Sequence, residues 1–381
     1  MKQFLVTYLL LLASSQLLAA DVWNQKSSMP AEGRHRTTGF SIGNKGYMGL
    51  GHYNSGPNGN IAKADIWEYD PTNDSWTQKA DYGGGPTYGA TAFTIDQYAY
   101  VGAHVYGTSE FYKFDPIANE WTPISSSPEG AADHVSFSLN GKGYFMTFSN
   151  YYQYKPINDQ WALMGSTPSN VGSWSNAFAV GEKGYLLATN GSLYEYKEIT
   201  NTWTYRSDFP GESVGGWSNF VANGKAYIFS GYIAFLNPTS RQLWEYDPAT
   251  NGWNQMEDLP GATRRFSSAF SIGNKGYIGT GTNGTNMSDL WEFDQVLASE
   301  KLTLDEPQII FDNQNKTIKF ILNHENSIAG LDIYNLSGQL ILHLDSPTQN
   351  EWISLFDFNK GLYICVLRDV NNHVYSKKIT L

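Results

Sequence analysis

FSIGNKGY, residues 40–47, occurs again unchanged at residues 270–277, and related segments appear four times between the two copies. In each of the six copies a Phe precedes a Tyr by seven residues, and the residue just before the Tyr is Gly or Ala. The six pairs are Phe40 with Tyr47, Phe93 with Tyr100, Phe137 with Tyr144, Phe178 with Tyr185, Phe220 with Tyr227, and Phe270 with Tyr277. Recurrence at this regularity indicates an internal repeat in which each copy is one supersecondary unit.

Each repeat unit is predicted to contain four strands. A Trp precedes every repeat Tyr by 23 or 24 residues, and segments such as WEYDPTNDSW (67–76) place turn residues between an aromatic run and that Trp. The Phe run, the Tyr run, the W/Y-E-Y/F run and the Trp run are therefore four successive strands. The sixth unit stops at LWEFDQ (290–295) without a Trp, whereas Trp23 begins the chain without a unit of its own. We expect an all-β, six-bladed β-propeller in which the N-terminal strand closes the last blade.

The repeat resembles the Kelch family across residues 21–295. The similarity lies in the small residues next to the second strand, in the aromatic strand followed by D-P-x-x-N, and in the Trp after it. The double glycine typical of the family is reduced to GLG (49–51), to GTG (279–281) or to the single Gly102. The resemblance implies a propeller whose ligands bind at the mouth of the central channel.

The N-terminus has the pattern of a secretory signal peptide. Residues 1–20 read MKQFLVTYLLLLASSQLLAA, in which one Lys precedes an apolar run and small residues follow it. We expect cleavage near Ala20 and a mature protein that is secreted or held at the bacterial cell surface. No other long apolar run follows, so no membrane span is expected in the mature protein.

A second, smaller domain is predicted at the C-terminus. Residues 296–306 are interpreted as a linker, and residues 307–381 alternate apolar and polar residues in short runs, typical of a small antiparallel β-sandwich. The segments LDIYNLSGQLI (331–341) and ISLFDFNKGLYICVL (353–367) and the closing Lys377-Lys378-Ile379 are similar to the type IX secretion sorting domain of Bacteroidetes. This resemblance implies the type IX secretion machinery as a partner. An ordinary immunoglobulin-like accessory module is the alternative.

Composition excludes several function classes. The formal net charge of −11 leaves no basic face for phosphate backbones, so nucleic acid is not expected as a partner. Cys365 is the single cysteine, which rules out an internal disulfide, and we interpret it as a small buried hydrophobic residue. No H-x-x-x-H or C-x-x-C spacing occurs, and we predict neither a metal site nor a cofactor.

The candidate ligand site is a set of loop positions ten to thirteen residues before the repeat Tyr residues. These positions differ from unit to unit and are rich in the residue types that stack on sugars or bind carboxylates. Three longer loops (52–65, 231–242 and 282–289) belong to consecutive units and are expected to border one side of the mouth. Packing between blades is the alternative role for these side chains. The candidates are Arg34, His35, Tyr88, Asp133, His134, Trp174, Trp217, Arg264 and Arg265.

The predicted function is binding of a glycan or protein ligand at the channel mouth, without an assigned catalytic residue. The copper radical chemistry of some Kelch oxidases is excluded, because it requires a Cys in the propeller and Cys365 lies outside it. The sialidase signature S-x-D-x-G-x-x-W is absent as well. The alternative function, implied by the Kelch resemblance, is a carbohydrate-active enzyme such as a sialic acid mutarotase or epimerase.

Overall fold

The computed structural model divides the chain into two compact units, Asp21–Gln295 and the C-terminal part that begins at Val296. It describes residues 20–54, 59–105, 108–130, 133–229, 231–233, 238–296, 308–312, 315–321, 328–335, 337–348, 351–369 and 374–381. The predicted signal peptide, up to residue 19, and nearly all of the predicted linker lie outside these residues. No helix in the described part of the chain is long and apolar enough to cross a membrane.

Residues 21–295 form six four-stranded antiparallel sheets within the described ranges, which confirms the all-β prediction. The innermost strands are β2 (Thr38–Ile42), β8 (Thr91–Ile95), β12 (Val135–Leu139), β16 (Asn176–Val180), β20 (Ser218–Ala222) and β24 (Ser268–Ile272). The second strands are β3 (Lys45–Gly49), β9 (Tyr98–Gly102), β13 (Lys142–Met146), β17 (Lys183–Leu187), β21 (Lys225–Phe229) and β25 (Lys275–Gly279). The third strands are β6 (Ile66–Asp70), β10 (Phe111–Asp115), β14 (Asn150–Lys155), β18 (Ser192–Lys197), β22 (Leu243–Asp247) and β26 (Leu290–Val296). The outermost strands are β7 (Ser75–Lys79), β11 (Glu120–Ile124), β15 (Gln160–Ser166), β19 (Thr202–Asp208), β23 (Gly252–Gln255) and β1 (Ala20–Lys26).

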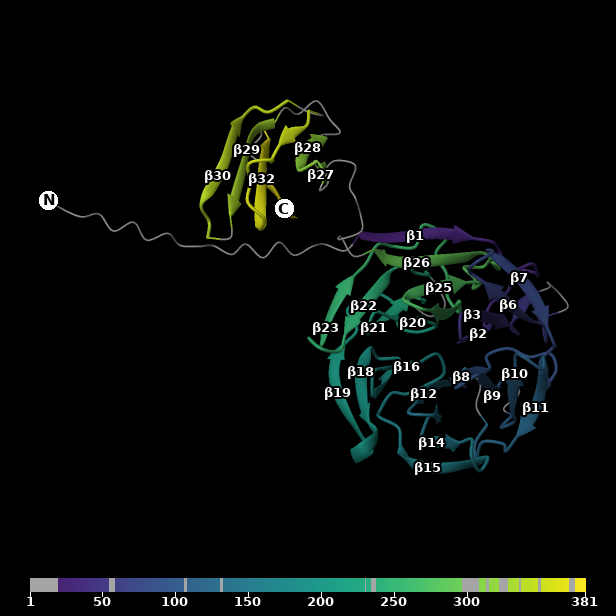
Figure 1. Ribbon diagram of the computed structural model, residues 1–381. Coiled ribbons are helices and arrows are strands. Elements are labelled where there is room, and N and C mark those ends of the chain that lie inside the picture. The colour runs from purple at the N-terminus through teal and green to yellow at the C-terminus, as the bar shows by residue number, and fades with distance from the viewer. Residues whose placement is uncertain are drawn as a thin grey trace. The chain divides into compact units, whose positions relative to one another are not determined.

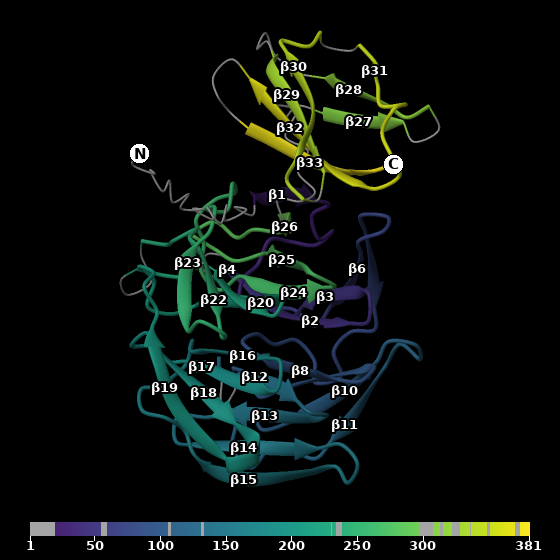
Figure 2. The same cartoon turned by 60° about the vertical axis from the view of Figure 1, so that its left-hand side comes forward.

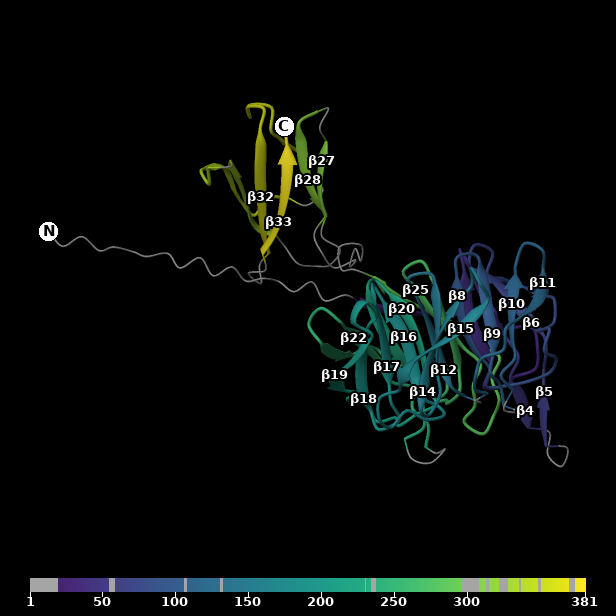
Figure 3. The same cartoon turned by 90° about the horizontal axis from the view of Figure 1, so that it is seen from below.

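The six sheets stand in a ring around a central channel (Figure 1). Each innermost strand contacts the innermost strands of both neighbouring sheets, and the series closes where β24 contacts β2. Figure 2 shows the four strands β12 to β15 of one sheet following one another from the channel outward. A short hairpin of β4 (His52–Asn54) and β5 (Asn60–Ala62) extends beyond the sheets at one end of the ring (Figure 3). A single 3-10 turn, Glu198–Thr200, follows β18.

Strand β1 is the outermost strand of the sheet that contains the last repeat. It pairs beside β26, so residues from both ends of the repeat region share one sheet. The Trp23 ring lies 5.0 Å from Phe293 and 6.4 Å from Phe229, and its indole N–H donates to the Glu257 carbonyl at 2.9 Å. The N-terminal strand therefore completes a sheet that would otherwise have an open edge at β26.

The repeated Phe and Tyr face each other across the inner hairpin of every sheet. Phe40 pairs with Tyr47, and the same register holds in all six sheets, which confirms the predicted hairpins. The Phe ring also packs against the next sheet, at the small residue that precedes the Tyr there. A Cβ added to Gly46 would lie 2.0 Å from the Phe270 ring, and one added to Gly143 would lie 2.2 Å from the Phe93 ring. At Gly46 and Gly143 the neighbouring ring therefore occupies the space of any side chain, whereas Ala99 and Ala226 take the equivalent position in two other sheets.

The C-terminal unit consists of two antiparallel sheets with a shared hydrophobic core. One sheet contains β27 (Gln308–Asp312), β28 (Thr317–Ile321) and β31 (Ile353–Ser354). The other contains β30 (Leu340–Asp345), β29 (Ile328–Asn335), β32 (Leu362–Asp369) and β33 (Val374–Thr380). Cys365 is fully buried among Phe320, Ile333 and Ile379, and burial raises the pKa of its thiol to about 12. This agrees with its interpretation as a small hydrophobic residue.

Removal of β1 should destabilise the whole ring. A chain that begins at Met29 loses the Trp23 contacts and exposes the hydrogen-bonding edge of β26. We expect a lower unfolding midpoint and a broader transition than for a chain that begins at Asp21, measured by circular dichroism in a urea titration. Equal midpoints and slopes for the two chains would show that closure by β1 is unnecessary.

Candidate functional site

The mouth of the channel is formed by one residue from each sheet, always eleven positions before the repeat Tyr. All six have positive φ angles, between 53° and 74°. Each backbone N–H donates to the carbonyl of the corresponding residue in the preceding sheet at 2.9–3.3 Å, so six hydrogen bonds form a closed circle. We call this set the mouth ring: Arg36, Gly89, Asp133, Trp174, Gly216 and Phe266.

The mouth ring borders a cavity of about 200 Å³ that opens into the channel. A second cavity, of about 300 Å³, lies between the innermost strands further along the same axis. Besides the ring, the first cavity is lined by small residues such as Ser175 and Ser267 and by His134 and Trp217. The space is smaller than the roughly 300–1,000 Å³ of pockets for drug-sized ligands, so it suits a single sugar ring rather than an extended chain.

Arg36 is the central charged group of the mouth, and the sequence analysis did not select it. Its guanidinium lies 4.7 Å from the centre of the Phe266 ring, 5.6 Å from Trp174 and 5.7 Å from Tyr88. It also forms an ion pair with Asp133 at 3.2 Å. Among the described residues, its buried Nε has no hydrogen-bond partner. Arg36 is thus held by aromatic faces and keeps donor capacity.

Asp133 is the acidic partner at the mouth. It accepts a hydrogen bond from the Trp174 indole N–H at 3.1 Å in addition to the Arg36 ion pair. Burial raises the pKa of its carboxyl group above the ordinary range, against the opposing effects of Arg36 and Trp174. The carboxylate is therefore easier to protonate than one exposed to water.

Arg265 gives the mouth a second cation. Its guanidinium lies 5.9 Å from the Phe266 ring, and burial together with the charge of Arg36 lowers its pKa. Arg36 and Arg265 therefore lie in the same region, where Asp133 is paired with Arg36 among the described residues. A bound anion would relieve the repulsion between the two cations.

Histidines next to the mouth are uncharged at neutral pH. The His35 and His52 rings are 4.1 Å apart, and the Tyr88 ring lies 4.0 Å from the His52 ring at an interplanar angle of 37°. Burial is the main cause that lowers the pKa of His35 to about 4, of His52 to about 3 and of His134 to about 4. These rings supply polar but neutral surface beside the two arginines.

The three long loops are tied to the mouth by backbone contacts. His35 bridges to His52 in the first loop, and Arg265 bridges to Thr282 in the third. In the second loop, Tyr232 exchanges backbone hydrogen bonds with the segment before β20 and lies 5.6 Å from the Trp174 ring. The inserts of three consecutive sheets therefore reach the same end of the channel, as their lengths suggested.

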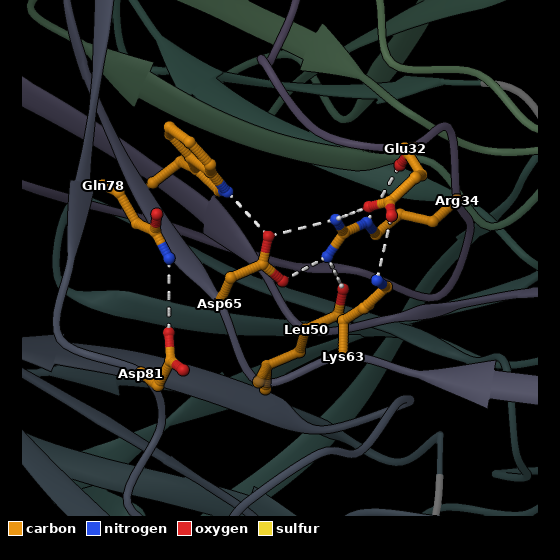
Figure 4. A network of polar contacts seen from close by, with 8 residues as sticks. Glu32, Arg34, Leu50, Lys63, Asp65, Gln78 and Asp81 are labelled. Atoms are coloured by element: carbon orange, nitrogen blue, oxygen red, sulfur yellow. Dashed lines mark hydrogen bonds and ion pairs between the residues drawn. The ribbon is translucent and has the colours of Figure 1, made fainter.

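Arg34 and Arg264 have a different environment from the one expected of ligand contacts. Both side chains are fully buried. Arg34 forms a two-point ion pair with Asp65, which also accepts from the Trp67 indole, and it donates to the Leu50 carbonyl (Figure 4). Arg264 repeats this arrangement with Asp289, Trp291 and the Thr280 carbonyl. A ligand could reach neither guanidinium without displacing its carboxylate, so we assign both a structural role within their sheets.

Trp217 lines the mouth cavity, but most of its side chain is buried in packing contacts. It is 7% exposed, its ring lies 5.8 Å from Phe209, and its indole donates to the Ser213 hydroxyl at 2.7 Å. The remaining candidates do converge: Asp133, His134 and Trp174 line the mouth cavity, and His35, Tyr88 and Arg265 adjoin Arg36 or Phe266. Arg36 and Phe266 are the residues that the sequence analysis missed. A fixed offset of eleven residues from the repeat Tyr would have found them.

No group of three or more His, Cys, Asp and Glu side chains that could hold a metal ion occurs in the described part of the chain. The expectation that the protein uses neither metal nor cofactor stays a prediction.

Loss of Arg264 should destabilise the fold. The change Arg264→Ala leaves Asp289 without its ion-pair partner, and breaking such a buried pair costs about 3–5 kcal/mol of unfolding free energy. The matched change Arg265→Ala removes a guanidinium outside the buried pair and should cost about 1 kcal/mol or less. Urea titrations of both variants make the comparison. Equal losses would show that Arg265 is a structural bridge too.

Comparisons with known proteins give results for both units. The family model described as the secretion system C-terminal sorting domain matches residues 313–381. N-acetylneuraminate epimerase of Escherichia coli O139:H28 (strain E24377A / ETEC) is 27% identical over 165 residues, which cover 41% of this chain and 45% of the relative. The N-acetylneuraminate epimerase of Shigella boydii serotype 4 (strain Sb227) has the same identity and coverage. The chain thus spans less than half the length of these curated relatives.

A solved structure, that of YjhT, resembles the chain with a TM-score of 0.58. It covers 70% of this chain and 95% of its own length at 19% sequence identity. At this identity the likeness shows the fold alone, an all-β propeller. The C-terminal residues 313–381 are a secretion sorting domain, which associates the chain with the type IX machinery and with secretion or the cell surface.

Proposed function

We propose that residues 21–295 are a six-bladed Kelch-type propeller that binds a carboxylate-bearing sugar, of the sialic acid class, at the mouth ring. One observation carries the proposal: the Arg36 guanidinium lies at the mouth against the faces of Phe266, Trp174 and Tyr88. The cavity lined by Arg36, Trp174 and Phe266 has room for one sugar ring. The similarity to N-acetylneuraminate epimerases supports this ligand class.

The ligand would be held by charge on one side and by aromatic faces on the other. Its carboxylate would accept hydrogen bonds from Arg36 and Arg265, which are stronger than those between neutral groups. Its ring would pack on Trp174 and Tyr88, whose faces suit the C–H surface of a sugar. Because the cavity admits a single ring, the residue bound would be a terminal one.

We further propose that the chain leaves the cell in two steps. Residues 1–20 would act as a signal peptide cleaved near Ala20, and residues 307–381, after a linker at 296–306, would be the β-sandwich read by the type IX machinery. The match of the sorting-domain model to residues 313–381 supports the second step. The sugar would then be met outside the cell, on a surface or in the medium.

A catalytic role is the second candidate, because the relatives that match are epimerases. Opening a sugar ring requires a base to remove the anomeric hydroxyl proton and an acid to protonate the ring oxygen. Asp133, with its raised pKa, and the neutral His35 or His134 could exchange such protons. Faster exchange between the anomers of N-acetylneuraminate, followed by NMR, would favour this role over binding alone.

Arg36→Met should weaken binding of N-acetylneuraminate. The loss of one charge-assisted hydrogen bond corresponds to roughly 1.5–3 kcal/mol, or a 10- to 150-fold higher Kd in isothermal titration calorimetry. The control is Arg368→Met, which removes a half-exposed guanidinium paired with Asp332 in the C-terminal unit and should leave Kd unchanged. Equal affinity of the Arg36 variant and the unaltered protein would contradict the assignment of the site.

Binding should strengthen as the pH falls below neutral, for as long as the pH stays above the pKa values of the histidines. The folded pKa of Asp133 is raised, so its carboxylate is neutralised first and stops competing with the ligand for Arg36. The histidines do not contribute in this range, since the pKa values of His35, His52 and His134 are about 4, 3 and 4. Asp133→Asn, which can still accept from Trp174, should bind more tightly at pH 7 and lose the pH dependence. Affinity that falls on acidification would speak against this role of Asp133.

A further inference from the structure

Tryptophans on the outermost strands link each sheet to its neighbour. In five cases the indole N–H donates to a residue in or just after the outermost strand of the preceding sheet. The acceptor is always the residue four positions after the Trp of that preceding strand. The donors and acceptors are Trp23 with the Glu257 carbonyl, Trp76 with Ser27, Trp121 with Ala80, Trp161 with Ser125, and Trp253 with the Ser207 hydroxyl. The sixth, Trp203, forms no such bond: its buried Nε1 has no partner of hydrogen-bonding geometry among the described residues. The Tyr151 hydroxyl nevertheless lies close enough for the indole to lower the pKa of Tyr151, against the larger effect of burial, which raises it.

A bulge in the preceding sheet accounts for the missing bond. Strand β15 changes register opposite Tyr151 and Tyr152, and β19 changes register at the equivalent place. At both bulges the backbone carbonyl four residues after the Trp does not accept the indole hydrogen bond of the next sheet. In β19 the Ser207 hydroxyl takes over at 3.0 Å, whereas β15 has Gly165 at that position, which has no side chain. The donor on Trp203 is therefore left without a replacement.

The same bulge borders a cavity lined by residues of the outer strands β15 and β19. These two strands lie at the outside of the ring, away from the channel (Figure 1). The cavity measures about 410 Å³ and is lined by aromatic and hydroxyl-bearing side chains, with no charged residue. Tyr194 and Tyr205 meet edge to face at 6.1 Å, and Tyr205 is 51% exposed. The lining comprises Tyr151, Met164, Gly165, Ser166, Thr167, Pro168, Ser169, Tyr194, Asn201, Trp203 and Tyr205.

Asn201 is hydrogen-bonded to residues around this cavity, whereas the bulged edge at Gly165 forms no hydrogen bond with the Trp203 indole. Tyr151 and Tyr196 both donate to the Asn201 side-chain oxygen, at 2.8 and 2.9 Å. Asn201 in turn donates to the Met164 carbonyl at 2.9 Å. The Tyr151 ring stands edge-on to the Trp203 ring at 5.7 Å. A small displacement of the chain at Gly165 would open the indole N–H to an acceptor on a bound molecule.

We propose that this cavity, which we call the outer pocket, binds a neutral sugar residue. Exposed tyrosine faces suit the C–H surface of a sugar ring, and the serine and threonine hydroxyls suit its hydroxyl groups. The unpaired indole N–H seeks an acceptor such as a ring, hydroxyl or acetamido oxygen, and satisfying a buried donor is favourable. Because no charged side chain lines it, the outer pocket does not select the carboxylate that the mouth ring would bind.

The test uses an array of neutral and sialylated oligosaccharides probed with the complete secreted protein. At least one neutral oligosaccharide should be retained, and Trp203→Phe and Tyr205→Ala should each weaken its binding at least tenfold. Arg36→Met should leave this binding unchanged and affect only the sialylated ligands. The two proposals therefore fail separately. No retained neutral glycan, or a neutral glycan lost with Arg36→Met, would overturn the outer pocket.

Trp161→Phe is the matched control for the indole. It deletes an N–H that is bonded to the Ser125 carbonyl, so it should lower the melting temperature and leave neutral-glycan binding intact. Trp203→Phe deletes an unbonded N–H and should leave the melting temperature nearly unchanged. A matching loss of melting temperature in both variants would mean that Trp203 already has a partner, and the proposal would be wrong.

Discussion

The contact of a phenylalanine ring with a glycine or alanine of the next sheet is the interaction on which the ring of sheets depends. It sets the distance between neighbouring innermost strands, because a Cβ at Gly46 or Gly143 would already overlap the ring that it faces. The same Phe stacks on the Tyr of its own hairpin, with ring centres 5.1 Å apart for Phe40 and Tyr47. One side chain therefore serves both the hairpin and the joint between sheets. Since the contact recurs around the ring, every loop at the mouth starts from an equivalent position.

Repeated features were predictable from the sequence, and features particular to one sheet were predictable only in part. The Phe and Tyr register follows from a constant spacing of seven residues, and the structure has it in all six sheets. The residues of the site were harder to predict. The loop positions ten to thirteen residues before each repeat Tyr include side chains that point in different directions. Arg34, Arg36 and Arg265 fall in equivalent windows, yet Arg34 is buried on Asp65, while Arg36 lies at the mouth. Arg36 differs from the other two arginines in its left-handed backbone, which occurs at the position eleven residues before the repeat Tyr. The chemical type of the side chain does not reveal this backbone conformation.

Charge separates the two proposed sites of the ring. At the mouth, burial keeps three histidines neutral, so the arginines and Asp133 alone determine the local charge. The outer pocket has tyrosines, hydroxyls and an unpaired indole but no ionisable cation or carboxylate in its lining. Under the two proposals, one repeat scaffold would provide two surfaces for sugars of different charge. They would engage separate residues of a branched glycan without competing.

The left-handed backbone of the mouth ring carries a thermodynamic consequence. A residue with a side chain is less stable than glycine in this conformation, by roughly 1–2 kcal/mol. Gly89 and Gly216 avoid this cost, whereas Arg36, Trp174 and Phe266 incur it at φ angles of 53°, 74° and 53°. Because the circle of hydrogen bonds uses backbone atoms only, it places no demand on the side chains. The bulky residues therefore make the ring less stable than six glycines would. Backbone strain that is concentrated at the mouth of a channel is typical of a functional site.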